Sequence, residues 1–163
     1  MSTAPAYTAQ GKLIPQGAAS RPLASCASTI MEDGVQDNVD PRLLVAMAFV
    51  EGKWGGDTDA ASTDNSFGLH NAQGHLGNFT KIGGWAVGIQ EAAETVNTMI
   101  YDRNLNTVSL LYSGLPGAYC QGPNCKAHKG GVVSKQLKAL GGDPASLSSP
   151  CYLQDGNYYE KSK

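Results

Sequence analysis

The sequence predicts a mainly helical protein of the α+β kind, with a small β element. Residues 43–50, LLVAMAFV, form an unbroken apolar run, which is typical of a buried helix. Residues 84–103 carry apolar side chains at helical spacing, with acidic residues mostly outside that face. The 20 glycines and 8 prolines among 163 residues indicate many turns and long loops rather than a regular bundle.

The N-terminal part is expected to contain an arm and then a short helix. Residues 1–20 are small and polar, with prolines and glycines, and predict an extended N-terminal arm. Ser20 is expected to cap a helix over about 21–33 that Gly34 ends. Since the length fits one hydrophobic core and no internal repeat is visible, residues 21–163 are predicted to form a single domain.

The apolar run is expected to belong to a central helix with a well-marked start. Asp40 suits the N-cap and Pro41 the first helical position, which is the preferred order at the beginning of a helix. The helix is predicted from residue 41 to about 52 and is apolar almost all round, so it should be buried. A loop of small and acidic residues follows over 55–66.

The next segments alternate between extended and helical patterns. Residues 67–82 contain Gly-x-x-Gly turns and predict a short hairpin or two extended pieces. Residues 84–103 then predict a helix, with one apolar face formed by Trp85, Ile89, Val96 and Ile100.

The C-terminal third is expected to hold two short helices and a polar tail. One helix is predicted over 106–113, followed by a long loop that holds the Cys120 and Cys125 pair. Residues 131–142 predict an amphipathic helix ended by glycine. The tail from 143 is rich in Pro and Ser and ends in the polar sequence YYEKSK.

Charge and hydropathy exclude several function classes. The formal net charge of −2 provides no basic field for nucleic acid or an anionic membrane. No window approaches the roughly 18 apolar residues needed for a membrane span. The first 17 residues lack the basic and apolar regions of a signal peptide, so we expect a protein without one or the mature form of a secreted protein.

The four cysteines predict two disulfides. Cys120 and Cys125 bracket a Gly-Pro turn, and Cys26 and Cys151 would then join the two ends of the domain. There is no C-x-x-C pair and the histidines are scattered, so a zinc site is the weaker interpretation, and reduced buried thiols are the other alternative. Two disulfides place the protein in an oxidising compartment, secreted, periplasmic or extracellular.

Glu51 ends the apolar run and is the first candidate for chemistry. Its helix neighbours, such as Ala48, are apolar, while Arg42 lies more than two turns away and Lys53 points elsewhere by helix geometry. Partial burial without a cation raises the pKa of a carboxyl group, which keeps a general acid protonated near neutral pH. An acid opening into a glycine-rich loop suits protonation of a leaving-group oxygen in a cleft. The alternative is an ordinary solvated glutamate.

Three motifs carry a resemblance to a known family. They are Glu51-Gly-Lys-Trp54-Gly55 followed by Asp64-Asn65-Ser66-Phe67-Gly68-Leu69, then Phe79 to Ile89 with Trp85 inside it, and Tyr119-Cys-Gln-Gly-Pro123-Asn-Cys125. Together they resemble the bacterial autolysin and flagellar type of endo-β-N-acetylglucosaminidase, a group of peptidoglycan hydrolases. The resemblance covers about residues 40–140.

The resemblance implies a lysozyme-like fold with a buried central helix and a reduced β-lobe. It implies cleavage of the β-1,4 glycan of peptidoglycan, or a related N-acetylated glycan, with Glu51 as general acid/base. No metal or organic cofactor is implied, and we expect a monomer.

The sequence departs from the family in its acidic residues. The family often supplies a second acid from a longer β-lobe, but the segment between Leu69 and Phe79 contains none here. Asp64 is the nearest candidate by motif, although a structural role is at least as well supported, and Asp57 and Asp59 are the others. Because two-carboxylate hydrolysis needs such a partner, a substrate-assisted route with one acid fits better, as in lytic transglycosylases of the same fold.

The remaining site candidates have both functional and structural interpretations. Tyr119 matches a cleft tyrosine that orients the acid or contacts sugar, or it is an ordinary loop-packing residue. The others are expected to bind substrate, with turn capping, loop packing or hairpin polarity as the alternatives. These residues are Trp54, Asn65, Phe67, Gly68 and His70. Two further functions stay open, a non-catalytic domain that binds glycan or a partner, and a structural part of a wall-penetrating assembly.

Overall fold

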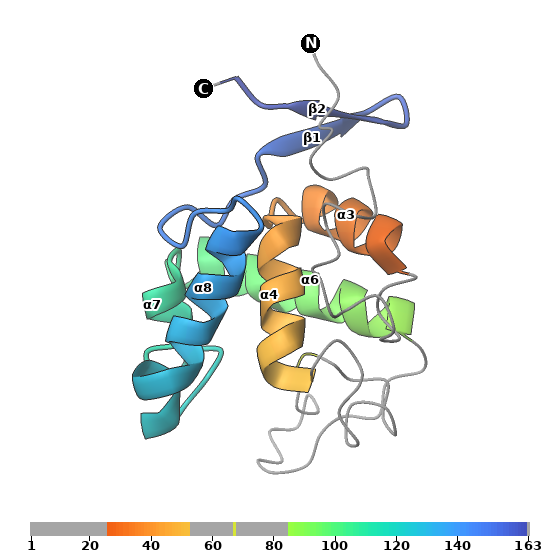
Figure 1. Ribbon diagram of the computed structural model, residues 1–163. Helices are drawn as coiled ribbons and strands as arrows, with labels where there is room; N and C mark the ends of the chain where they lie inside the picture. The colour runs from red at the N-terminus through yellow and green to blue at the C-terminus, as the bar shows by residue number, and fades with distance from the viewer. Residues whose placement is uncertain (1–25, 53–66, 68–84, 163) are drawn as a thin grey trace.

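The computed structural model describes residues 26–52, 67 and 85–162. Within these ranges the protein is mainly helical, with five α-helices and one two-stranded antiparallel sheet. Helix α4 lies between α3 and α8, and α6 crosses behind it (Figure 1). None of the described helices combines the length and the apolar character that a membrane crossing requires.

The central helix α4, Pro41–Gly52, confirms the predicted start and extent. Asp40 caps it, because its Oδ1 accepts a hydrogen bond from the backbone N–H of Arg42 at 2.9 Å and its carbonyl accepts one from Leu43 at 2.9 Å. The helix is buried on all sides along its middle, as its uniform apolar composition predicts. The residues buried there are Leu43, Leu44, Val45, Ala46, Met47 and Ala48.

Helix α3, Ala27–Gln36, does not end where the sequence predicted. Gly34 lies inside the helix, and a Cβ on it would lie 2.9 Å from the carbonyl oxygen of Val39 and 3.0 Å from Cγ of Pro41. The glycine therefore permits α3 to approach the start of α4 closely, and it does not stop the helix. The chain turns two residues after Gln36, where Asn38 has a φ of 54°.

Helix α6, Trp85–Tyr101, confirms the predicted helix and most of its apolar face. Ile89, Val96 and Ile100 are buried, whereas the side chain of Trp85 lies outside the described part. Helix α7, Val108–Leu111, is shorter than predicted and begins after Thr107, whose side chain accepts from the N–H of Leu110.

Helix α8, Gly130–Ala139, continues directly from a π-helical turn, η3, at Cys125–Lys129. The helical segment thus starts earlier than the predicted residue 131 and ends earlier than 142. Helices α4 and α8 pack against each other and run in opposite directions, so the beginning of the α8 segment lies beside the end of α4 (Figure 1).

A β-hairpin near the C-terminus contradicts the polar tail that the sequence predicted. Strand β1, Cys151–Gln154, pairs antiparallel with β2, Asn157–Glu160. Asp155 and Gly156 form the turn with φ values of 51° and 77°, the geometry that an Asp-Gly pair favours in a two-residue hairpin. The β element predicted at 67–82 lies outside the described residues, except for Phe67.

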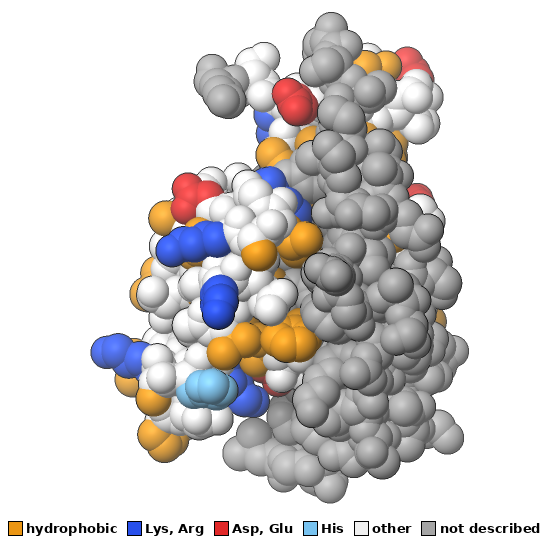
Figure 2. Space-filling view, viewed as in Figure 1, with side chains coloured by type: hydrophobic (Ala, Val, Ile, Leu, Met, Phe, Trp, Pro, Cys, Tyr) orange, Lys and Arg blue, Asp and Glu red, His pale blue; other side chains and the backbone are white. Residues whose placement is uncertain are grey.

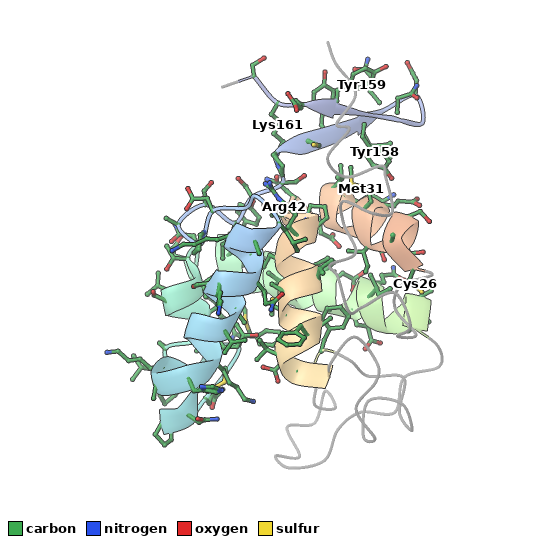
Figure 3. The ribbon with its side chains drawn as sticks, in the orientation of Figure 1. Cys26, Met31, Arg42, Tyr158, Tyr159 and Lys161 are labelled. Atoms are coloured by element: carbon green, nitrogen blue, oxygen red, sulfur yellow. A yellow bond between two sulfur atoms is a disulfide. The ribbon has the colours of Figure 1, made fainter. Side chains whose placement is uncertain are left out.

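Only the first of the two predicted disulfides is formed. Cys120 and Cys125 are bonded, but the Cys26–Cys151 bond is absent, and Cys151 is a buried thiol. Cys26 lies at the start of α3 (Figure 3), whereas Cys151 is the first residue of β1, a strand that packs against that helix. Burial and the charges of Glu160 and Asp40 raise the pKa of the Cys151 thiol to about 11, which keeps it protonated at neutral pH.

Candidate functional site

Glu51 lies in the last turn of α4 with its side chain 11% exposed. Its Oε2 is 3.6 Å from Nζ of Lys129, and its Oε1 is 3.5 Å from the hydroxyl oxygen of Tyr112. The two carboxylate oxygens therefore face different groups, one a cation and the other a neutral hydroxyl. This geometry fixes the plane of the carboxyl group more firmly than one contact would.

Tyr112 approaches Glu51 from the end of α7 and is almost completely buried. Burial raises its pKa well above the ordinary value, and the negative charge of Glu51 and its contact with Tyr119 raise it further. The hydroxyl consequently keeps its proton at neutral pH and donates to Glu51. The ring centroids of Tyr112 and Tyr119 lie 6.0 Å apart with an angle of 36° between the ring planes, so the two aromatic rings pack against each other.

Tyr119 connects the site to the segment of the Asn-x-Phe-Gly motif. Its hydroxyl donates to the backbone carbonyl of Phe67, while burial and the charge of Glu51 raise the pKa of Tyr119 well above its ordinary value. The ring of Phe67 is buried in the core next to the helices. The structure thus brings together Glu51, Tyr119 and Phe67, three residues that the sequence selected separately.

Sequence reasoning missed both described residues that contact the Glu51 carboxyl group, Tyr112 and Lys129. The expectation that no cation neutralises Glu51 is wrong, because Lys129 approaches it from the π turn. Neither local pattern nor motif pointed to this residue, since it reaches Glu51 only through the packing of α8 against α4. Lysine and arginine side chains are spread over the face above α7 and α8, and no sequence signal separates Lys129 from the others (Figure 2).

The disulfide between Cys120 and Cys125 lies between two residues of the site, Tyr119 and Lys129. Tyr119 directly precedes Cys120, and Lys129 ends the π turn that Cys125 begins. Backbone hydrogen bonds close the loop as well, from Gly114 to the carbonyl of Cys120 at 3.2 Å and from Gly122 to the carbonyl of Gly114 at 2.9 Å. The covalent bond and these hydrogen bonds together constrain the backbone that carries Tyr119 and leads to Lys129.

Five of the predicted site residues lie outside the described part of the chain, and their roles stay predictions. They are Trp54, Asp64, Asn65, Gly68 and His70. The question of a second catalytic carboxylate depends on Asp64 and its neighbours, so the described residues do not answer it.

No protein-family model matches the chain, and a search of curated proteins finds no similar sequence. The chemistry of the site is therefore argued from its geometry. In the described part of the chain, no three His, Cys, Asp or Glu side chains are grouped as metal ligands. What the described residues offer is a mostly buried carboxyl group, with one hydroxyl donor and one cation, suited to holding and moving a proton.

Alanine substitutions at two adjacent glycines of α8 would test whether the helix must approach Tyr112 closely. A Cβ on Gly130 would lie 3.1 Å from Cβ of Tyr112, whereas one on Gly131 would have no atom within 4 Å. Both line a cavity of about 330 Å³. We expect Gly131→Ala to raise the free energy of unfolding by up to about 1 kcal/mol through helix propensity. In Gly130→Ala, overpacking against Tyr112 should cancel this gain and lower the free energy of unfolding below that of wild type by about 1–3 kcal/mol.

Chemical denaturation of both variants measures the difference. Equal stability of the two would show that Tyr112 yields easily and that the approach of α8 does not hold it in place.

Proposed function

We propose that the protein is a glycosidase that cleaves the β-1,4 glycan of peptidoglycan or a related N-acetylated glycan, with Glu51 as its general acid/base. The observation that carries the proposal is the Glu51 carboxyl at the end of the apolar central helix, 11% exposed and held between Tyr112 and Lys129. A group so placed is protected from bulk water and still able to exchange a proton.

The three motifs support the same proposal from the sequence side. The acid motif around Glu51, the Asn-x-Phe-Gly motif and the tyrosine loop are the parts that resemble the glucosaminidase family. The hydrogen bond from Tyr119 to the carbonyl of Phe67 joins two of these motifs beside the acid. We propose on this basis a lysozyme-like fold with a reduced β-lobe, and a secreted, periplasmic or extracellular location.

The proposed reaction needs only one protein carboxyl group. Glu51 gives its proton to the glycosidic oxygen as the bond from that oxygen to C1 breaks, and the sugar's own 2-acetamido oxygen or 6-hydroxyl attacks C1. In the first case Glu51 then takes a proton from the water that opens the cyclic intermediate. In the second it takes the proton of the 6-hydroxyl, and the product is a 1,6-anhydro sugar.

Digestion of purified sacculi tests the proposal. The wild-type protein should release soluble fragments, and Glu51→Gln should lower the rate about 100- to 10,000-fold, the usual contribution of a general acid/base. Glu91→Gln, which removes a carboxylate from the exposed face of α6, is the matched control and should retain the wild-type rate. The mass of the new chain ends identifies the bond: a reducing N-acetylglucosamine end, a reducing muramic end, or an anhydro end for a transglycosylase.

A second candidate is a lysozyme-like domain that binds glycan or a partner without cleaving it. The contact with Lys129 favours it, because a cation 3.6 Å away stabilises the ionised carboxylate, which has no proton to donate. Release of no fragments by wild type, with equal binding of wild type and Glu51→Gln to sacculi, would replace the enzyme with this alternative.

A further inference from the structure

The π turn Cys125–Lys129 brings a cation to an acid on another helix. In a π turn the helix widens by one residue, which changes the direction of the side chains that follow; such turns are frequent at functional sites. Here Lys129 closes the turn, and its ammonium group lies 3.6 Å from the Glu51 carboxyl. The disulfide at Cys125 anchors the other end of the same turn.

Two features of the Glu51 site disfavour an ionised carboxylate, and the Lys129 cation counteracts them. Glu51 lies in the last turn of α4, where the helix dipole presents its negative end and disfavours a carboxylate. Burial disfavours the charged form as well, and only 11% of the Glu51 side chain is exposed. Lys129 opposes both effects. Its own side chain is 34% exposed, so water screens the attraction in part.

Among the described residues, two tyrosine hydroxyl groups also lie near Glu51, and both stay uncharged at neutral pH. Burial, with the Glu51 charge added, raises the pKa of both Tyr112 and Tyr119 well above the ordinary value. On the π turn itself, His128 and Lys126 are exposed to solvent. Lys129 is thus the cationic group through which the turn acts on the acid.

We propose that Lys129 is a positioning residue that holds the Glu51 carboxyl ionised and oriented in the resting protein. The inference rests on the proposed function for its catalytic consequence, while the pairing itself is independent of it. With Lys129 in place, the Glu51 carboxyl group gains its proton at a lower pH than it would without the cation. Lys129 would then set the upper limit of the pH range in which the proposed glycosidase works.

The pH dependence of fragment release tests the catalytic part. In Lys129→Gln the alkaline limb of the kcat/KM profile should move upward by about one pH unit, since loss of a neighbouring cation favours the protonated carboxyl. Lys129→Arg keeps the cation and should retain the alkaline limb of the wild-type profile. Lys126→Gln removes a lysine from the same turn and should also leave this limb unchanged. A merely structural role predicts a lower rate at every pH with the limb in place, and that result would overturn the proposal.

Carbon NMR of protein labelled at the glutamate carboxyl tests the pairing without any activity. The Glu51 resonance is the one that Glu51→Gln removes, and its titration midpoint should rise by about one pH unit in Lys129→Gln but not in Lys126→Gln. An unchanged midpoint overturns the inference, even if Glu51→Gln abolishes fragment release and the proposed function stands. A shifted midpoint with no fragment release from wild type would retain the pairing and overturn the proposed function.

Discussion

Replacing Asp40 by alanine is expected to lower the free energy of unfolding by about 3–5 kcal/mol, the cost of removing one partner of a buried ion pair. Asp40 is 1% exposed, and its two oxygens accept hydrogen bonds from the Arg42 side chain at 2.8–3.2 Å. The same carboxylate caps α4 through the backbone N–H of Arg42. Arg42 also donates to the carbonyl of Gly141 at 2.7 Å, so the pair connects the start of α4 to the end of α8 (Figure 3).

Two further variants separate the contributions at Asp40. Asp40→Asn keeps a good N-cap but loses the charge, so its loss of stability should fall between those of wild type and Asp40→Ala. Asp143→Ala removes an exposed aspartate that accepts from the backbone N–H of Ala145, and it should cost less than about 1 kcal/mol. Urea denaturation of the three variants gives the values. If Asp40→Ala costs no more than Asp143→Ala, the ion pair does not support the central helix.

Replacing Gly114 by alanine is expected to cost about 3 kcal/mol or more and to disturb the candidate site. Gly114 has a φ of 79°, where a side chain costs about 1–2 kcal/mol. Its Cβ would also lie 2.3 Å from the carbonyl oxygen of Gly122, so the backbone must move. That movement breaks the hydrogen bond from Gly122 to Gly114, and it shifts the loop that holds Tyr119 and Cys120.

Gly117 provides a matched control in the same loop. Its φ is 88°, but a Cβ there would have no atom within 4 Å, so Gly117→Ala pays only for the backbone conformation, about 1–2 kcal/mol. Gly114→Ala should lower both the free energy of unfolding, measured by denaturation, and the rate of fragment release more than Gly117→Ala does. Equal effects would mean that the close approach of residues 114 and 122 is not needed to shape the site.

Local signals explain what could be predicted. The start of α4 follows from Asp40 and Pro41, and α6 follows from helical spacing, because capping and periodicity depend on residues a few positions apart. The Asp155-Gly156 turn is an equally local signal for a hairpin, and the composition of the tail obscured it. Its absence from the prediction was thus an error of interpretation rather than a limit of the sequence.

Long-range packing explains what could not be predicted. Glycine can either end a helix or allow two helices to approach closely, and the sequence around Gly34 is compatible with both. Only the position of α4 beside α3 shows that Gly34 serves the close approach. The Cys26–Cys151 pairing failed for a similar reason, since the positions of α3 and β1, rather than the number of cysteines, determine which sulfur atoms meet.

By itself the sequence determined the central apolar helix, the acid at its end and the tyrosine loop closed by a disulfide. Each of these depends on residues close together in the chain, whose propensities and spacings act before the fold is complete. Only the tertiary structure decided what surrounds the acid. The packing of α8 against α4 brings Lys129 to Glu51, and the end of α7 brings Tyr112. Such contacts join distant segments, so their charge and geometry arise from packing alone.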